Sequence, residues 1–244
     1  MSRDFEGKVA FVTGAARGQG RSHTVRLAEE GADIIAIDLC GDISDVPYPL
    51  ATRADLDETV RQVEALGRSI VARVADVRDF NSIACALRAG VAELGGTWRT
   101  AKVPIPYLGR QGTGGSIVPT SSAAGLKGYA NIAHFTAAKH GINGLMKTLA
   151  QELSGHHVRV NTVNPTRVDT AMIMNGSMYR LFCPDIDNNP TCDDFAPVSQ
   201  AMNALPMPWV ESRDVSNSVL FLLSNKSRYI TGVALPVDAG MLIK

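Results

Sequence analysis

A glycine-rich turn between an apolar run and an amphipathic segment is the feature that most constrains the fold of this chain. The turn at residues 13–20 reads Thr-Gly-Ala-Ala-Arg-Gly-Gln-Gly and follows the apolar run at residues 9–12. In this context the first glycine permits a tight turn, the second lets backbone N–H groups approach a pyrophosphate, and the third allows helix and strand to pack closely. A plain glycine turn is the alternative. The candidate cofactor-binding residues here are Gly14, Arg17, Gly18, Gln19 and Gly20.

Aspartates end the next two expected strands, where a nucleotide would lie. Asp38 comes 18 residues after the last glycine of the turn, where a carboxylate accepts hydrogen bonds from both ribose hydroxyls. It would repel a 2′-phosphate, and neither Leu39 nor the three residues after it is an arginine, so NAD is favoured over NADP. Asp76 and Val77 end the third strand, at a position suited to the adenine edge. A solvated strand end is the alternative for each aspartate, but three features at successive strand ends favour a dinucleotide site.

Strands and helices are expected to alternate over the first 94 residues and to form a parallel sheet that is covered on both faces. The alternation then requires a strand after Gly96, but residues 97–103 have a helical composition and the next strand-like run begins at residue 116. Because a right-handed crossover returns the chain to the sheet after each helix, residues missing between Gly96 and Thr97 would remove a central strand. We therefore expect a Rossmann-type, doubly wound α/β fold whose fourth strand is absent from the sequence.

The rhythm resumes with expected strands at residues 116–120, 158–163 and 232–237, and Pro119 would remove a ladder hydrogen bond from the first of them. The stretch from Asn164 to Pro208 is too long for an ordinary loop and is interpreted as a lid over the carboxyl ends of the strands. We expect one NAD-binding domain over residues 1–244, with a lid or substrate segment at about 165–210.

Composition argues against several classes of partner. Lys+Arg and Asp+Glu both number 24, so no net charge recruits nucleic acid or an anionic membrane. No segment approaches the roughly 20 apolar residues of a membrane span, and a cytoplasmic location is expected. The four cysteines and five histidines show no metal-ligand spacing, so no metal site is expected.

A second constellation concerns catalysis. Phe135 lies thirteen residues after Ser122, and Lys139 follows it four residues later on an expected helix. Positions four apart share a helix face, so the ammonium of Lys139 would lie beside the group at residue 135. If residue 135 were a tyrosine, this cation would lower the pKa of its phenol. Phe135 has the ring but no hydroxyl, so it has no proton to give.

Together these motifs resemble the short-chain dehydrogenase/reductase family over almost the whole chain, with Asn164-Pro165 after the sixth strand as a further element. Residues 14–23, the insertion at 40–52, and residues 137–141 and 236–240 are similar to its actinobacterial, mycofactocin-coupled branch, which includes carveol dehydrogenases. The resemblance implies a tightly held NAD covered by the insertion. It also implies a homotetramer and an external redox partner.

The resemblance assigns roles residue by residue. Ser122 would orient and polarise the substrate oxygen, while Lys139 would bind the nicotinamide ribose and lower the pKa of the acid. The nicotinamide end would be held by Pro165, Val168 and Thr170. The proton donor of the family falls on Phe135, and the family's Asn-Ala-Gly strand end and catalytic asparagine would lie in the stretch that is missing after residue 96.

Three interpretations follow. The first is an NAD-dependent oxidoreductase for a hydrophobic secondary alcohol or ketone, impaired at Phe135. Apolar lid residues could line its pocket, although packing between lid and core explains them equally well: Met172, Ile173, Met174, Met178, Leu181 and Phe182. The second is a non-catalytic NAD-binding paralogue that acts as a sensor or oligomer partner. The third is that the sequence is not the whole natural chain. Tyr129 could replace the missing acid, but a structural role is favoured.

Overall fold

The protein is described by a computed structural model, which places residues 3–94, 112–187 and 189–244. The strands are β1 (Val9–Thr13), β2 (Asp33–Asp38), β3 (Ile70–Val74), β4 (Gly115–Ile117), β5 (Val158–Val160), β6 (Thr162–Pro165) and β7 (Ala234–Val237). The α-helices are α1 (Gly18–Glu29), α2 (Arg53–Ala65), α3 (Phe80–Leu94), α5 (Ala133–Glu152), α6 (Gly176–Phe182), α7 (Cys192–Ala201) and α8 (Ser212–Leu223). Short 3-10 helices are η1 (Ala123–Gly125), η2 (Ser154–His156), η3 (Asn225–Ser227) and η4 (Met241–Ile243).

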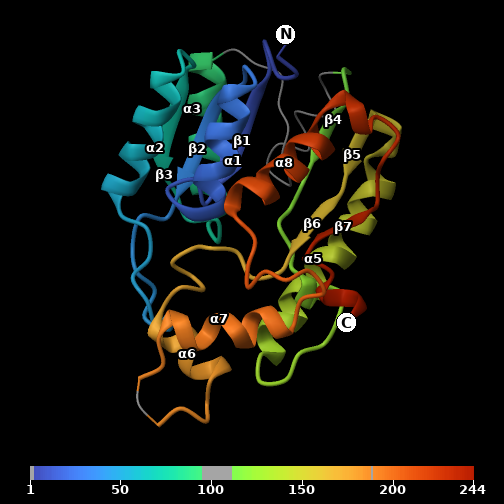
Figure 1. The fold of residues 1–244 in the computed structure, drawn as a ribbon. Coiled ribbons are helices and arrows are strands. Elements are labelled where there is room, and N and C mark those ends of the chain that lie inside the picture. Colours follow the sequence, from blue (N-terminus) through green and yellow to red (C-terminus); the bar gives the residue numbers. More distant parts are fainter. Residues whose placement is uncertain (1–2, 95–111, 188) are drawn as a thin grey trace.

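The strands pair in parallel in three groups, in the orders β1-β2-β3, β4-β5 and β6-β7. Within the described residues, β1 pairs with β2 alone and β4 with β5 alone, so no described strand joins these two groups. The predicted break between Gly96 and Thr97 lies outside the described residues. The helices α6 and α7 lie beyond the carboxyl ends of the strands, and the segment between β2 and α2 reaches down toward them (Figure 1).

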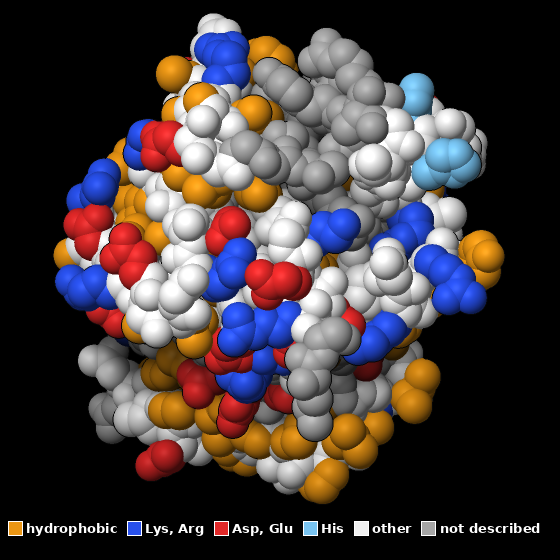
Figure 2. Space-filling view, turned by 90° about the horizontal axis from the view of Figure 1, so that it is seen from above, with side chains coloured by type: hydrophobic (Ala, Val, Ile, Leu, Met, Phe, Trp, Pro, Cys, Tyr) orange, Lys and Arg blue, Asp and Glu red, His pale blue; other side chains and the backbone are white. Residues whose placement is uncertain are grey.

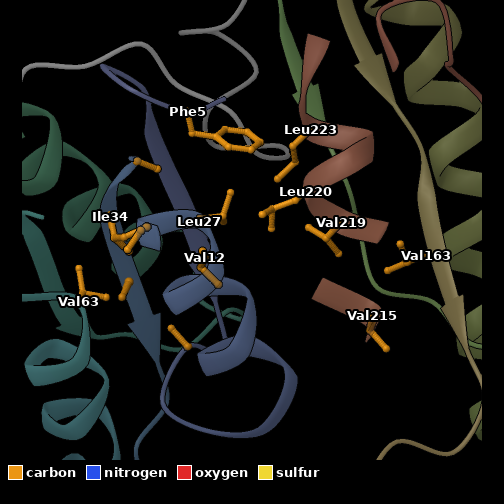
Figure 3. Close-up of a cluster of buried hydrophobic side chains, with 14 of the residues drawn as sticks. Phe5, Val12, Leu27, Ile34, Val63, Val163, Val215, Val219, Leu220 and Leu223 are labelled. Carbon is orange, nitrogen blue, oxygen red and sulfur yellow. The ribbon is translucent and has the colours of Figure 1, made fainter. Parts of the chain in front are cut away.

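Side chains of the central strands alternate between two apolar cores. Val12 and Ile34 belong to the core beneath α1, α2 and α8, where Val12 lies near Leu27 and Ile34 near Val63 (Figure 3). Ile35, the neighbour of Ile34, belongs to the second core, beneath α3 and α5. Because successive residues of a strand point to opposite faces, this arrangement requires helices on both faces of the sheet. The expected doubly wound arrangement is therefore found.

Several element boundaries differ from the predictions. The strand expected at 158–163 is interrupted and becomes β5 and β6. The strand expected at 116–120 ends at Ile117, because Pro119 has no N–H to continue the ladder, and pairing resumes only as an isolated bridge between Thr120 and Val163. The lid stretch, expected to be irregular, contains the helices α6 and α7.

The surface carries mixed charge. On the face shown in Figure 2, acidic and basic side chains are interspersed near the centre and are not separated by sign. The described part of the chain has no helix that is both long enough and apolar enough to cross a membrane. It also has no group of three or more potential metal ligands.

Candidate active site

The glycine-rich turn has the geometry that its sequence predicts. Gly14 and Gly18 have φ values of 67° and 55°, in the region that favours glycine. A Cβ on Gly20 would lie 1.8 Å from the carbonyl oxygen of Gly14, so any side chain there would collide with the turn. The residue before α1, Arg17, does not cap the helix with its side chain. The backbone N–H groups of the first turn therefore face outward as a site for an anion.

Asp38 closes the same site from the end of β2. Its Oδ2 accepts a hydrogen bond from the backbone N–H of Ala16 at 2.9 Å, and its Oδ1 accepts one from Cys40 at 3.2 Å. Each oxygen keeps a lone pair, so the oriented carboxylate can still accept from ribose hydroxyls. Leu39 follows it, half-buried. The structure thus brings Asp38 and the turn together as predicted.

A supporting network that the sequence did not reveal fixes the turn from the side of α2. The hydroxyl of Thr59 lies 3.0 Å from the carbonyl oxygen of Ala15 and accepts a hydrogen bond from Arg21 at 3.0 Å. The Arg21 guanidinium also donates to the carbonyl oxygens of Ala16 and Asp55. These bonds fix the carbonyl groups of Ala15 and Ala16 on the side of α2, while the N–H of Ala16 is held by Asp38.

The predicted adenine edge is more exposed. Asp76 is engaged by Arg78, which donates from Nη2 at 2.6 Å, and these hydrogen bonds lower the pKa of the Asp76 carboxyl. Val77 is 59% exposed. Arg17 turns to the insertion between β2 and α2, where it donates to the carbonyl oxygen of Pro49 at 2.6 Å. The insertion is thereby tied to the glycine-rich turn.

The expected nicotinamide end is formed by the segment after β6. Thr170 lies over the turn, because a Cβ at Gly18 would be 3.3 Å from its Cγ2. Val168 is buried and forms a parallel bridge with Val210. Within the described residues the amide oxygen of Gln19 is buried without a hydrogen-bond partner. An acceptor of this kind beside the turn fits a ligand that donates a hydrogen bond.

The catalytic candidates converge on this end. The Ser122 hydroxyl donates to the carbonyl oxygen of Pro165 at 3.4 Å and accepts from the N–H of Ala124 at 3.1 Å. Lys139 Nζ donates to the carbonyl oxygen of Thr120 at 3.2 Å and lies 5.4 Å from the centre of the Phe135 ring. Burial lowers the pKa of the Lys139 ammonium. The long bond from Ser122 is weak, so its hydroxyl is free to turn toward a ligand.

Buried polar groups fix the helix around Lys139, and the sequence analysis did not predict them. Asn143, one helical turn after Lys139, donates to the side-chain oxygen of Asn164 at 3.0 Å and accepts from the Thr162 hydroxyl at 2.8 Å. Ser121 donates to the carbonyl oxygen of Lys139 at 2.9 Å. Asn143 lies four residues after Lys139, and this spacing on a helix could have indicated that the two residues share a face.

Tyr129 has a buried hydroxyl with no hydrogen-bond partner among the described residues. Burial raises its pKa, and the neighbouring charges that affect it are those of Arg167 and Asp238. A raised pKa makes it a weaker acid, in contrast with the lowered pKa that the relay requires. Its role as a substitute proton donor is not favoured by these surroundings.

Comparison with known proteins identifies the family. The family model for enoyl-(acyl carrier protein) reductase matches residues 87–242. The chain is 50% identical over 274 residues to (-)-trans-carveol dehydrogenase of Rhodococcus erythropolis, with 98% of this chain and 99% of that protein covered. The chain belongs to the short-chain dehydrogenase/reductase family.

Solved structures of family members agree. Carveol dehydrogenase from Mycobacterium avium in complex with NAD has a TM-score of 0.96 and 48% identity, with both chains covered completely. A short-chain dehydrogenase from Mycobacterium paratuberculosis bound to NAD has a TM-score of 0.87 and 38% identity, with 99% of this chain and 100% of that chain covered. The predictions of a Rossmann-type fold and of a resemblance to the carveol dehydrogenase branch are confirmed.

The comparisons also bear on chain length. A putative short-chain type dehydrogenase/reductase from Mycolicibacterium smegmatis is 47% identical over 280 residues, with all of both chains covered. This chain has 244 residues. The alignment is therefore longer by 280 minus 244, or 36 positions, for which this chain has no residue.

Proposed function

We propose that the protein is an NAD-dependent oxidoreductase that transfers a hydride between a hydrophobic secondary alcohol or ketone and the nicotinamide. One observation carries this proposal. Ser122 and Lys139 lie at the carboxyl ends of the strands, beside the segment in which Thr170 lies over Gly18. Catalytic candidates and cofactor cradle thus face one place. Turnover is impaired because residue 135 is phenylalanine.

NAD is the cofactor of this site. Gly14 and Gly18 leave room for the pyrophosphate at the N-terminus of α1, and Asp38 is oriented to accept hydrogen bonds from the adenosine ribose. Bound NAD supplies the acceptor for the hydride that leaves the carbinol carbon. Lys139 would bind the nicotinamide ribose, and Pro165, Val168 and Thr170 would support the nicotinamide.

The chain has no group at residue 135 that can accept the proton of the alcohol. Ser122 can donate a hydrogen bond to the substrate oxygen, but the ring of Phe135 accepts and gives no proton. Loss of a positioned acid or base typically slows a reaction by about 10²- to 10⁴-fold. Slow turnover with solvent water as the proton acceptor is the expected result.

The substrate class follows from the lid and from the relatives. Met172 and Leu181 are 52% and 39% exposed, and they present apolar surface on and beside α6. Such surface suits a terpenoid alcohol of the carveol type, the substrate named for the Rhodococcus relative. Met-rich packing of the lid is the alternative for these residues.

A non-catalytic NAD-binding protein is the second candidate, and Phe135 favours it. The cofactor half of the site does not depend on a proton donor, so binding can persist without turnover. We further propose that the 36 positions without a counterpart fall between Gly96 and Thr97 and would supply the missing central strand and catalytic asparagine. An intact mass above 26.0 kDa for the natural protein would support this, and a mass of 26.0 kDa would count against it.

Titration calorimetry with NAD and NADP, followed by single-turnover hydride transfer with (-)-trans-carveol, tests the proposal. Tight NAD binding, much weaker NADP binding and slow but measurable transfer are expected. Binding without any transfer would favour the non-catalytic candidate, whereas absence of NAD binding would refute both.

The remaining expectations stay predictions. They are a single domain with its lid at about 165–210, a cytoplasmic homotetramer and an external redox partner. Sedimentation of the purified chain would test the assembly.

A further inference from the structure

Arg167 is a buried cation that forms no ion pair with a carboxylate in the described part of the chain. Its residue is 6% exposed, and no ion pair joins it to an acidic side chain within residues 3–94, 112–187 and 189–244. Burial lowers the pKa of its guanidinium. A buried charge is costly unless other groups compensate for the lost water, so the neutral groups around Arg167 must hold it in place.

Those neutral groups belong to the lid. The Nε of Arg167 donates to the hydroxyl of Ser199, and its Nη2 donates to the backbone carbonyl of the same residue at 3.0 Å. Nη2 also lies 3.5 Å from the side-chain oxygen of Asn203, just beyond α7. The guanidinium carbon lies 5.8 Å from the ring centre of Phe182, the last residue of α6. One side chain thus contacts both lid helices.

The backbone around Arg167 lies on the cofactor side of the site, opposite the lid. Its carbonyl oxygen accepts from the N–H of Val210 at 3.0 Å, and Asp169 donates to the carbonyl of Val210 at 3.0 Å. Two residues before Arg167, Pro165 accepts the hydrogen bond of Ser122, and three residues after it Thr170 covers Gly18. The segment 165–170 therefore contacts Ser122 through the backbone of Pro165, the cofactor turn through Thr170, and the lid through Arg167.

We propose that Arg167 is a positioning residue that couples the lid helices α6 and α7 to the segment 165–170 and so sets the nicotinamide half of the site. The inference rests on the proposed function, because it assumes that NAD binds with its nicotinamide against this segment. Arginine suits the role, since Nε and Nη2 form a planar fork that engages the hydroxyl and the carbonyl of Ser199 together. Lysine has a single donor centre and cannot reproduce this geometry.

The proposal predicts different effects on the binding of the two halves of the dinucleotide. Arg167 acts on the nicotinamide side, whereas Asp38 and Gly14 hold the adenosine and pyrophosphate side. Calorimetric titration of the full chain with NAD and with ADP-ribose, which lacks the nicotinamide, measures each side separately. The variants are Arg167→Met and Arg167→Lys, with Arg68→Met as a matched control. Arg68 is a half-buried arginine that forms ion pairs with Glu6 and Asp33, far in sequence from the lid.

We expect Arg167→Met to weaken NAD binding by about 5- to 150-fold, the usual range for coupled sites, and to change ADP-ribose binding by less than about threefold. Arg167→Lys should fall between the parent and Arg167→Met. Arg68→Met should leave the ratio of the two affinities unchanged, even where it lowers stability.

If Arg167→Met does not fold, Ser199→Ala replaces it, because it removes an acceptor of the fork and should lower NAD affinity in preference to ADP-ribose affinity. Equal losses for the two ligands, in whichever of the two variants folds, would overturn the coupling and leave Arg167 with a general structural role. A parent chain that binds neither ligand would instead refute the proposed function.

Discussion

Phe135→Tyr places a phenol beside Lys139, whose Nζ lies 5.4 Å from the centre of the present ring. For a separation of about 5 Å between the two charges and an effective dielectric constant of about 20, a unit positive charge stabilises a phenolate by about 3 kcal/mol. This corresponds to about two pKa units, so the phenol should titrate near pH 8, below its usual value of about 10. The new hydroxyl would then be a competent base for alcohol oxidation near neutral pH.

Single-turnover oxidation of a hydrophobic secondary alcohol, measured at saturating NAD over a range of pH, tests this. The rate should rise by about 10²- to 10⁴-fold over the parent chain and should increase with pH up to a plateau above about pH 8, because the phenolate accepts the alcohol proton. Phe135→Leu removes the ring without adding a proton and should stay at the parent rate. In the double variant with Lys139→Met, the midpoint should move back toward about pH 10.

Two results would refute the reasoning. A Phe135→Tyr protein that binds NAD as tightly as the parent but turns over no faster would show that residue 135 is not the limiting defect. A faster variant with an unshifted pH midpoint would show that Lys139 does not tune the acid.

Three further predictions concern other parts of the molecule. Burial lowers the pKa of His23 to about 4 from 6.5, so the neutral form is favoured in the folded state. The free energy of unfolding should be full above about pH 7.5 and should fall by about 2 kcal/mol between about pH 7.5 and pH 5 in denaturant titrations, a loss that His23→Asn should remove. Gly90→Ala places a Cβ 2.2 Å from Cδ1 of the stiff, buried Ile35, so it should lower the free energy of unfolding by about 1–2 kcal/mol despite the better helix propensity of alanine, and a gain would contradict this packing. Arg17→Ala removes the bond to Pro49, so NAD release in stopped-flow displacement should be about fivefold faster, and an unchanged rate would exclude this contact as a restraint on the cofactor.

The cofactor half could be predicted because its signals are local. The glycines of the turn are required by backbone conformation and by close packing, so their spacing alone identifies the strand–turn–helix unit. Asp38 follows from the length of β2, which fixes where a strand-end carboxylate lies. Thr52 and Asp55 likewise form a capping box at the start of α2, and its signal is local too.

The lid side could not be predicted to the same depth, because its contacts join residues far apart in sequence. Arg167 reaches Ser199, 32 residues away, and nothing in the local pattern around either residue indicates the pair. The helices α6 and α7 are short, and the stretch that contains them, residues 164–208, is rich in proline, methionine and asparagine, as a loop would be. Pro197 lies inside α7 itself. Tertiary packing, more than intrinsic propensity, accounts for these helices.

Lys139 shows which measurement can distinguish the two functional candidates. Burial lowers the pKa of its ammonium, and within the described residues it donates one hydrogen bond, to Thr120. Burial of a cation costs stability, and in the absence of a phenol at residue 135 the proton relay gives no reason to retain it. Binding of a ribose hydroxyl does, because that role requires a cation at this position and is independent of the missing proton. We therefore infer that the arrangement around Phe135 preserves cofactor binding and has lost only the proton transfer, as both candidates require, so that single-turnover hydride transfer, and not NAD affinity, distinguishes them.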